Sequence, residues 1–282
     1  SLSVSVTYDC CSSLRDGWIG ILRTSLWKFS VWGKLFFLKP KFSYKLIDFI
    51  EWFSIYNIVP IGLVLKMTIG INDNFTKKED PIIDLTKKKA KNFKLNNEQN
   101  NALKYLEIIN NKFDVSVLQG TTGSGKTLVY FERIKKIIDK KKQALVLLPE
   151  IFLTNEFKSR FEDFFGYEPA IWHSKITPKK KRIMWKGIIE NKIKLVVGAR
   201  SALLLPFKNL GIIVVDEEHD TSYKQDEGVI YHARDMAISR ASLEKIPINL
   251  VTSIPSVELV PSIFSLSTIA NLPINLLSPS LV

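Results

Sequence analysis

Apolar residues follow two different spacings along the chain. Between residues 41 and 70 they recur about every three to four positions, which is typical of an amphipathic helix. This spacing predicts a helix over about Leu46–Ile55. Pro60 and Gly62 then interrupt the pattern, and a second helix is expected around Leu63–Met67.

From Leu95 onward, short continuous apolar runs alternate with helical spacing. A helix is predicted over Thr127–Ile138. Continuous apolar runs separated by helices are typical of a parallel sheet that is covered on both faces. The sequence therefore predicts an α/β fold, with strands over Val115–Leu118, Ala144–Leu148, Leu195–Val197, Ile212–Val215 and Ile248–Val251.

Two further segments carry no such pattern. Residues 1–40 show no clear periodicity and are left unassigned. Within them, Trp18–Leu38 is apolar but contains three basic residues, whereas a spanning helix needs about 20 mostly uncharged residues, so a membrane span is rejected. Residues 71–94 are rich in charge and are interpreted as a linker.

Residues 259–282 contain no charged side chain, in contrast to the lysine-rich chain before them. Prolines at positions 261, 273 and 279 argue against a helical anchor. A genuine apolar extension is one interpretation. We favour another, in which the reading frame or the gene model departs from the true protein near Glu258.

The balance of charge is strongly basic, with a formal net charge of +12 over 282 residues. Such a balance favours a polyanionic partner, nucleic acid or an acidic membrane surface, although a lysine-rich surface in an AT-rich genome would look the same. The two cysteines, Cys10 and Cys11, are adjacent and cannot complete a four-ligand zinc site. The absence of a disulfide framework fits a reducing cytosol.

One segment has the pattern of a phosphate-binding loop. It fits G-x-x-x-x-G-K-[ST], in which glycines let backbone N–H groups face the phosphates. The lysine, Lys126, is expected to reach the β- and γ-phosphates, and the hydroxyl of Thr127 to bind Mg²⁺. The loop consists of Gly120, Thr121, Thr122, Gly123, Ser124, Gly125, Lys126 and Thr127.

An acidic box, residues 216–219, follows the β-branched run Ile212–Val215. Side chains at the carboxyl end of a buried parallel strand face the crevice where ligands bind. Asp216 is expected to bind Mg²⁺, and Glu217 to orient and deprotonate the attacking water. His219 is expected to sense the γ-phosphate. Taken alone, these residues would also fit a solvated acidic turn.

Together these residues resemble superfamily 2 helicases, and the details resemble the PriA family of bacterial replication-restart helicases (primosomal protein N′). The similarity runs from about Leu95 to Glu258, which would be the first ATP-binding lobe. It implies that Gln99 contacts adenine and that Leu148–Thr154 lies on the DNA side of the lobe. Residues 41–70 more weakly resemble the end of the family's N-terminal DNA-binding domain, although a packed helical hairpin would explain them too.

The resemblance also assigns candidate DNA contacts and a coupling loop after the acidic box. Tyr223 and Tyr231 are expected to stack on bases, while positive side chains meet phosphates. The alternative is an ordinary surface loop. The residues assigned to coupling and DNA binding are His219, Tyr223, Lys224, Tyr231, Arg234 and Arg200.

The chain departs from the family in several ways. The family's Ser-Ala-Thr-Pro-Ser motif aligns with residues 252–256, where Ile254 replaces a threonine hydroxyl, which puts the coupling of hydrolysis to strand movement in doubt. Neither the second motor lobe with its arginine finger nor the ligands of the family's zinc module are recognisable.

The resemblance implies a cytoplasmic bacterial 3′→5′ DNA helicase that uses ATP and Mg²⁺. Its partners would be forked or single-stranded DNA, primosome proteins and single-strand-binding protein, with no membrane. As written, the chain is expected to hold only the first lobe and not to unwind DNA alone. Two alternatives stay open: a nucleic-acid-binding module that does not depend on ATP, and a non-functional pseudogene fragment.

Overall fold

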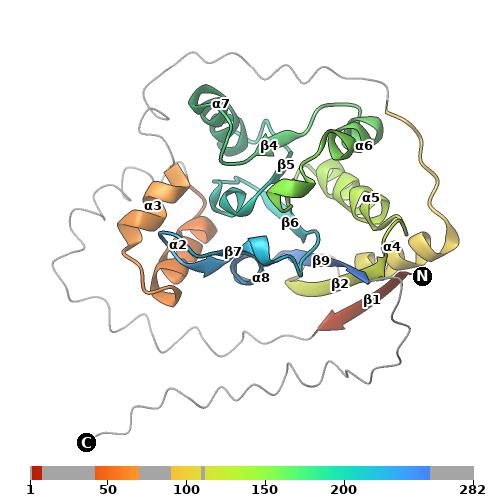
Figure 1. The fold of residues 1–282 in the computed structure, drawn as a ribbon, viewed down its shortest axis with the longest axis horizontal. Helices are drawn as coiled ribbons and strands as arrows, with labels where there is room; N and C mark the ends of the chain where they lie inside the picture. Colours follow the sequence, from red (N-terminus) through yellow and green to blue (C-terminus); the bar gives the residue numbers. More distant parts are fainter. Residues whose placement is uncertain (1, 8–41, 70–89, 109–111, 255–282) are drawn as a thin grey trace, which may run out of the picture.

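The computed structural model describes residues 2–7, 42–69, 90–108 and 112–254. They form an α/β structure around a seven-stranded sheet with strand order β1-β2-β9-β6-β3-β5-β4 (Figure 1). Six of these strands run parallel to one another, and β1 pairs antiparallel with β2 at one edge. The predicted fold class, a parallel sheet with helices on both faces, is confirmed.

The sheet strands are β1 (Leu2–Thr7), β2 (Asp114–Thr121), β3 (Gln143–Leu147), β4 (Ala170–Trp172), β5 (Leu195–Gly198), β6 (Leu210–Val215) and β9 (Pro247–Ile254). A two-stranded ribbon is formed by β7 (Lys224–Gln225) and β8 (Tyr231–His232). The helices are α2 (Tyr44–Tyr56), α3 (Ile61–Ile69), α4 (Asn97–Ile108), α5 (Lys126–Asp139), α6 (Asn155–Phe165), α7 (Pro178–Ile189) and α8 (Ala233–Glu244). Short 3-10 turns span Glu150–Phe152, Arg200–Leu204 and Thr221–Tyr223.

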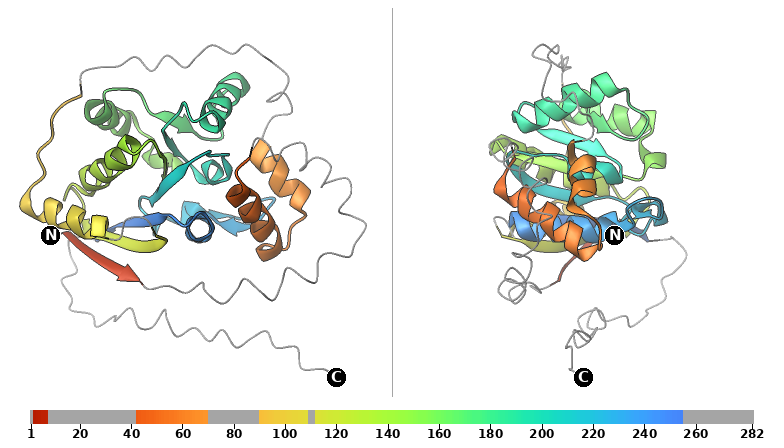
Figure 2. Two further views of the ribbon diagram at one scale, coloured as in Figure 1. Left: turned by 180° about the vertical axis from the view of Figure 1, so that it is seen from behind. Right: turned by 90° about the vertical axis from the view of Figure 1, so that its left-hand side faces the viewer.

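The central strand β6 shows why the sheet is covered on both faces. All six of its residues are buried. Successive side chains in a strand point to opposite faces. Accordingly, Ile212 and Val214 join the apolar core under α4, α5 and α6, whereas Ile213 and Val215 join the core under α2, α3, α7 and α8. Figure 2 shows these two helical layers on either side of the sheet.

The helical hairpin α2–α3 packs against the α/β sheet rather than standing apart from it. Lys45 Nζ donates to the carbonyl oxygen of Glu244 at 2.7 Å, and the indole N–H of Trp185 donates to that of Thr68 at 3.0 Å. The ring of Phe53, which is fully buried, meets the ring of Tyr231 edge-on at 5.2 Å. Both predicted helices are confirmed. The assignment of this segment to a DNA-binding domain remains a prediction.

Two edge strands were not predicted from the sequence. β1 falls in the stretch that was left unassigned, and β4 has only three residues, too few to show a period. Other predictions lie outside the described residues: the apolar stretch Trp18–Leu38, the cysteines Cys10 and Cys11, the linker up to residue 89 and the tail 259–282. Among the described residues, no helix has the length and apolar character needed to cross a membrane.

Candidate functional site

The predicted phosphate-binding loop connects β2 to α5 at the carboxyl edge of the sheet. Gly123 and Gly125 adopt the left-handed conformation, with φ of +80° and +82°. This conformation costs a side-chain-bearing residue about 1–2 kcal/mol, so the loop depends on glycine at these two positions. A Cβ at Gly125 would also clash with the side-chain amide nitrogen of Gln99. The local backbone has the curl that the phosphate-loop pattern predicts.

Gln99 links the start of α4 to this loop. Its Oε1 accepts from the N–H of Asn96 at 2.9 Å, and its own N–H donates to Asn96 Oδ1 at 2.8 Å. Its Nε2 donates to the carbonyl oxygen of Ser124 at 3.1 Å. Gln99 therefore lies at the phosphate loop, with its amide oriented by Asn96. Its contact with adenine remains a prediction.

Lys126 is folded back onto its own loop. Its side chain is buried, and Nζ donates to the carbonyl oxygens of Gly120 and Thr121 at 2.9 and 3.0 Å. Burial lowers the pKa of Lys126, while the carboxylates of Glu217 and Asp216 act in the opposite direction. The ammonium is thus within electrostatic reach of the acidic box. Phosphate oxygens would have to replace the two carbonyl acceptors when a nucleotide binds.

Asp216 directly follows β6 and is held from several sides. Its Oδ2 accepts from the hydroxyl of Tyr130 at 2.8 Å, and its Oδ1 accepts from the N–H of Glu217 at 3.0 Å. Burial raises the pKa of Asp216 to about 6, and the hydrogen bond from Tyr130 counteracts part of this shift. Each carboxylate oxygen keeps a second lone pair, so the group can still accept Mg²⁺ or a bound water.

The acidic box is hydrogen-bonded to the end of β9. Ser253 Oγ donates to Glu217 Oε1 at 2.9 Å, and Thr252 Oγ1 lies 3.1 Å from His219 Nδ1. The hydroxyls at positions 252 and 253 therefore contact the acidic box directly, although Ile254 lacks one. The side chain of Ile254, and residues 255–256, lie outside the described part of the chain. The effect of Ile254 on the coupling of hydrolysis to strand movement remains a prediction.

The expected stacking of Tyr223 and Tyr231 on bases is wrong for this structure. The two side chains are only 0% and 3% exposed, so neither ring offers a face to a base. The hydroxyl of Tyr223 is committed to buried carbonyl oxygens, those of Leu147 at 3.0 Å and Asp216 at 2.6 Å. The ring of Tyr231 packs on Phe53 of α2. Both residues build the core beneath the loop.

The cations expected to meet phosphates are paired with groups of the protein. Arg234 donates to Glu218 Oε2 at 2.9 Å and to Asp235 Oδ1 at 3.0 Å. Lys224 pairs with Asp226 at 3.0 Å on the surface, and Arg200 donates to the carbonyl oxygen of Lys224. Their predicted roles in DNA binding would require phosphates to replace these partners.

Sequence reasoning missed Tyr130 and did not assign a role to Ser253. Tyr130 lies four residues after Lys126, so the two side chains share one face of α5, and that spacing could have revealed it. Ser253 carried no such signal, because its partner Glu217 is distant in sequence.

The other predicted magnesium ligand, Thr127, is half-buried at the start of α5. Among the described residues, no group of three or more His, Cys, Asp or Glu side chains could hold a metal ion by itself.

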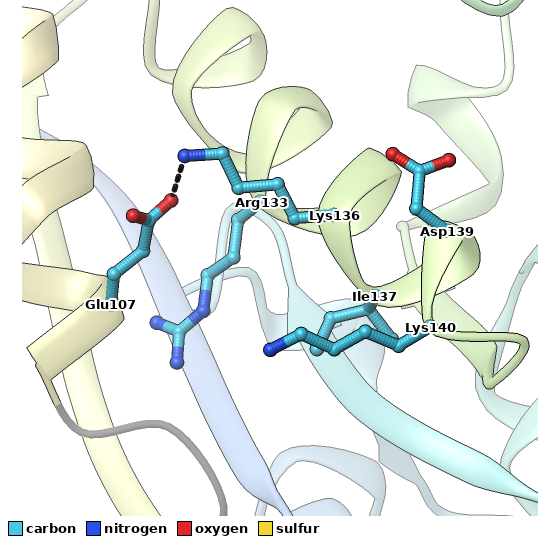
Figure 3. Close-up of a pocket in the computed structure, with 6 residues that line it drawn as sticks. All are labelled: Glu107, Arg133, Lys136, Ile137, Asp139 and Lys140. Carbon is cyan, nitrogen blue, oxygen red and sulfur yellow. Dashed lines mark hydrogen bonds and ion pairs between the residues drawn. The ribbon is translucent and has the colours of Figure 1, made fainter.

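A separate hollow lies between the carboxyl-terminal halves of α4 and α5, away from the phosphate loop (Figure 3). Its volume is about 370 Å³. The guanidinium of Arg133 points into it, and Lys136 pairs with Glu107 at its rim. The lining residues are Glu107, Arg133, Lys136, Ile137, Asp139 and Lys140.

Comparison with known proteins identifies the family. The DEAD/DEAH box helicase family matches residues 96–253, more than half of the chain. The replication restart protein PriA of Rickettsia conorii is 40% identical over 231 residues, which are 80% of this chain and 35% of that protein. PriA of Bacillus subtilis is 41% identical over 181 residues, which are 64% of this chain and 22% of that protein.

Among solved structures, the DUF1998 helicase MrfA is 23% identical, with a TM-score of 0.38, over 57% of this chain and 27% of that one. The chain spans about a third of the length of the Rickettsia PriA proteins, 35–36%. A match over residues 96–253 covers the phosphate loop, the acidic box and the end of β9 together. This chain belongs to the DEAD/DEAH box helicase family of ATP-dependent enzymes, and within it is similar to the replication restart protein PriA.

Proposed function

We propose that the described residues form the first ATP-binding lobe of a 3′→5′ DNA helicase of the replication-restart type. The observation that carries the proposal is geometric: Asp216 of the acidic box is hydrogen-bonded at 2.8 Å to Tyr130, one turn after Lys126 on α5, so the acidic box and the phosphate loop meet at one edge of the sheet. Phosphoryl transfer requires a cation at the β- and γ-phosphates close to a carboxylate that binds magnesium and to a group that orients water. One edge of this sheet supplies all three.

Each residue would have a distinct role in nucleotide binding. The backbone N–H groups of Gly120–Thr127 would hold the phosphates, and Gln99, already oriented by Asn96, would contact the base. Thr127 and Asp216 would hold Mg²⁺, which neutralises charge on the phosphate oxygens when bound. The donor set fits this ion, since Mg²⁺ prefers carboxylate, hydroxyl and water oxygens.

Glu217 would orient the attacking water and accept its proton. Ser253 donates to Oε1, so Oε2 would be the oxygen that faces the water. His219 lies 3.8 Å from that second oxygen and also contacts Thr252, so it would link the hydrolytic site to the end of β9. The residues proposed to contact DNA are Arg200, Lys224 and Arg234.

The proposed biological setting follows from similarity to the replication restart relatives. Forked or single-stranded DNA would be the substrate, primosome proteins and single-strand-binding protein would be the partners, and the site of action would be the bacterial cytoplasm. Because the described residues contain one lobe, the chain as given is proposed to bind nucleotide without unwinding DNA.

The proposal is tested by titrating a fluorescent ATP analogue into the purified chain with Mg²⁺, followed by ATPase assays with and without forked DNA. Lys126→Ala should abolish binding, while Glu217→Gln should keep binding and remove any turnover. Unchanged affinity in Lys126→Ala would refute the site. Salt-dependent DNA binding with no nucleotide affinity in the unmodified chain would favour the alternative, a nucleic-acid-binding module that does not use ATP.

A further inference from the structure

The start of α7 carries the densest positive charge in the described part of the chain. The twelve residues 175–186 include six basic side chains and no acidic one, against a net charge of +12 for all 282 residues. The basic residues are Lys175, Lys179, Lys180, Lys181, Arg182 and Lys186. We call this cluster the α7 basic patch.

Three side chains of the α7 basic patch are free to meet a partner. Lys175, Lys179 and Lys180 are exposed, and no carboxylate of the described residues forms an ion pair with them. This distinguishes them from Arg234 and Lys224, which are occupied by Glu218 and Asp226. A polyanion could bind here without first displacing a protein carboxylate.

The position of these lysines on the helix opposes helix stability. Thr177 caps α7 by accepting from the N–H of Lys180, and the first turn contains no acidic residue. The amino end of a helix bears a partial positive charge, so lysines there are unfavourable where acidic side chains would stabilise the helix. A second triplet, Lys140–Lys142, follows the carboxyl end of α5, where positive charge is favourable. An anion bound near Lys179 and Lys180 would therefore also be favourable for the amino end of α7.

The α7 basic patch adjoins the edge of the sheet that carries the nucleotide site. α7 follows β4, which runs parallel to β5, so its first turn lies at the same carboxyl edge as the phosphate loop. Ser174 Oγ donates to Glu150 Oε1 at 3.0 Å, and Lys181 Nζ donates to the carbonyl oxygen of Ser174 at 3.0 Å. Glu150 belongs to the segment Leu148–Thr154, for which the resemblance to superfamily 2 helicases implies a position on the DNA side. Figure 1 shows α7 beside the outer strand β4.

We propose that the α7 basic patch binds the phosphate backbone of DNA and extends the DNA path of the lobe outward along this edge. The inference rests on the proposed function, since it assumes that the lobe acts on DNA. Lysine ammonium groups act as point charges that release counterions from the backbone, so this contact is independent of base sequence and sensitive to salt. It adds affinity without adding specificity.

The test compares two charge-reversal variants of the full chain that have the same net charge. The first is Lys179→Glu with Lys180→Glu, and the matched control is Lys140→Glu with Lys141→Glu. Fluorescence anisotropy measures the affinity for labelled single-stranded and forked DNA across a series of salt concentrations. Thermal unfolding and binding of the ATP analogue are measured on the same samples.

The α7 variant should bind DNA at least about tenfold more weakly at low salt, with the slope of log K against log salt reduced by about one to two, since each phosphate contact contributes about 0.9. Its melting temperature should rise, because acids now occupy the amino end of the helix. The control should keep the DNA affinity of the unmodified chain and lose thermal stability. Nucleotide binding should be unchanged in both.

Equal loss of DNA affinity in the two variants would overturn the inference, because net charge alone would then explain binding. No loss in either would overturn it as well and leave the proposed function standing. If the unmodified chain binds the ATP analogue but no DNA, the proposed function on DNA fails, and the inference with it. Binding to vesicles rich in phosphatidylserine, lost in the α7 variant and without DNA binding, would assign the α7 basic patch to a membrane surface instead.

Discussion

The hydroxyl of Tyr223 donates a hydrogen bond of 2.6 Å to the main-chain carbonyl oxygen of Asp216. The same oxygen lies 3.0 Å from the carbonyl oxygen of Leu147, at the end of β3, so its single proton can be shared between the two acceptors. Tyr223 thereby connects the loop after the acidic box to the ends of the adjacent strands β3 and β6. Since Asp216 is the proposed magnesium ligand, a movement of this loop would be transmitted to the metal site through one phenol.

Removing the hydroxyl of Tyr223 and that of Tyr231, one at a time, should change the free energy of unfolding by different amounts. Tyr223→Phe removes the one proton that these carbonyl oxygens share, and in the described part of the chain only that of Leu147 keeps a second donor, the N–H of Asp216, so the free energy of unfolding should fall by about 1–3 kcal/mol. Tyr231→Phe is the matched control, because the hydroxyl of Tyr231 is buried with no hydrogen-bond partner among the described residues. Its removal should be neutral or stabilising. Urea denaturation measures both, and equal losses would contradict this account of the loop.

Magnesium-dependent nucleotide binding should weaken as the pH falls through about 6. Burial raises the pKa of Asp216 to about 6, so the carboxyl group becomes protonated below that value and no longer attracts the metal. About tenfold weaker binding is expected one pH unit below the pKa, since a proton then occupies nine sites in ten. Titration of the ATP analogue with Mg²⁺ between pH 5 and 8 checks this, and a flat profile would count against Asp216 as ligand.

The same shift predicts the opposite trend for the stability of the nucleotide-free protein. The folded pKa of Asp216 lies above the ordinary value of 3.8, so its favourable contribution is complete below about pH 4 and is lost as the pH rises through 6. Asp216→Asn should therefore stabilise the free protein at pH 7 by about 1–3 kcal/mol while it weakens Mg²⁺ binding. Thermal unfolding without nucleotide measures the first effect, and a destabilised variant would show that the buried charge is better compensated than described.

Alanine at the two left-handed glycines should separate backbone strain from steric clash. Gly123→Ala should lower the free energy of unfolding by about 1–2 kcal/mol, the cost of the left-handed conformation alone, because nothing lies within 4 Å of the added Cβ. Gly125→Ala carries the same strain and also displaces the amide of Gln99. Its loss should be clearly larger. Chemical denaturation of the free protein compares them, and equal losses would mean that Gln99 moves aside at no cost.

Most of the fold follows from the sequence because buried parallel strands have an unmistakable composition. The run Ile212–Val215 was recognisable as a strand, and the acidic box behind it had to lie at the carboxyl edge. The position of the proposed nucleotide site was predictable for the same reason, since Lys126 and Thr127 follow a strand and begin a helix. Local patterns sufficed wherever neighbours in sequence are also neighbours in space.

The burial of Tyr223 and Tyr231 could not be predicted from local sequence patterns. Tyr223 and Tyr231 lie in a polar, charged loop, a composition that predicts exposure, and their aromatic rings suggested base stacking. Their burial depends on segments distant in sequence: Leu147 accepts from one hydroxyl, and Phe53 packs on the other ring. The contact of Ser253 with Glu217 spans 36 positions in the same way. Long-range contacts of this kind leave no period or spacing in the sequence.

The guanidinium of Arg133 is expected to reduce the stability of this lobe. It is 1% exposed, and none of its three nitrogens has a hydrogen-bond partner among the described residues. Burial lowers the pKa of Arg133 to about 10, which means that burying the charged guanidinium is unfavourable. Attraction from Asp114 and Glu107 raises the pKa again, but only in part. Those two carboxylates are bonded elsewhere, Asp114 to the hydroxyl of Ser116 and Glu107 to Lys136 (Figure 3).

Arg133→Met should therefore raise the free energy of unfolding by about 1–3 kcal/mol, because a flexible apolar side chain fills similar space without unsatisfied donors. Lys136→Met is the control on the same helix. Its ion pair with Glu107 is partly exposed, so the change should stay within about 0.5 kcal/mol. Urea denaturation measures both variants. If Arg133→Met destabilises the protein instead, the guanidinium must have an acceptor in solution, and ordered water in the hollow between α4 and α5 would be the first place to look for it.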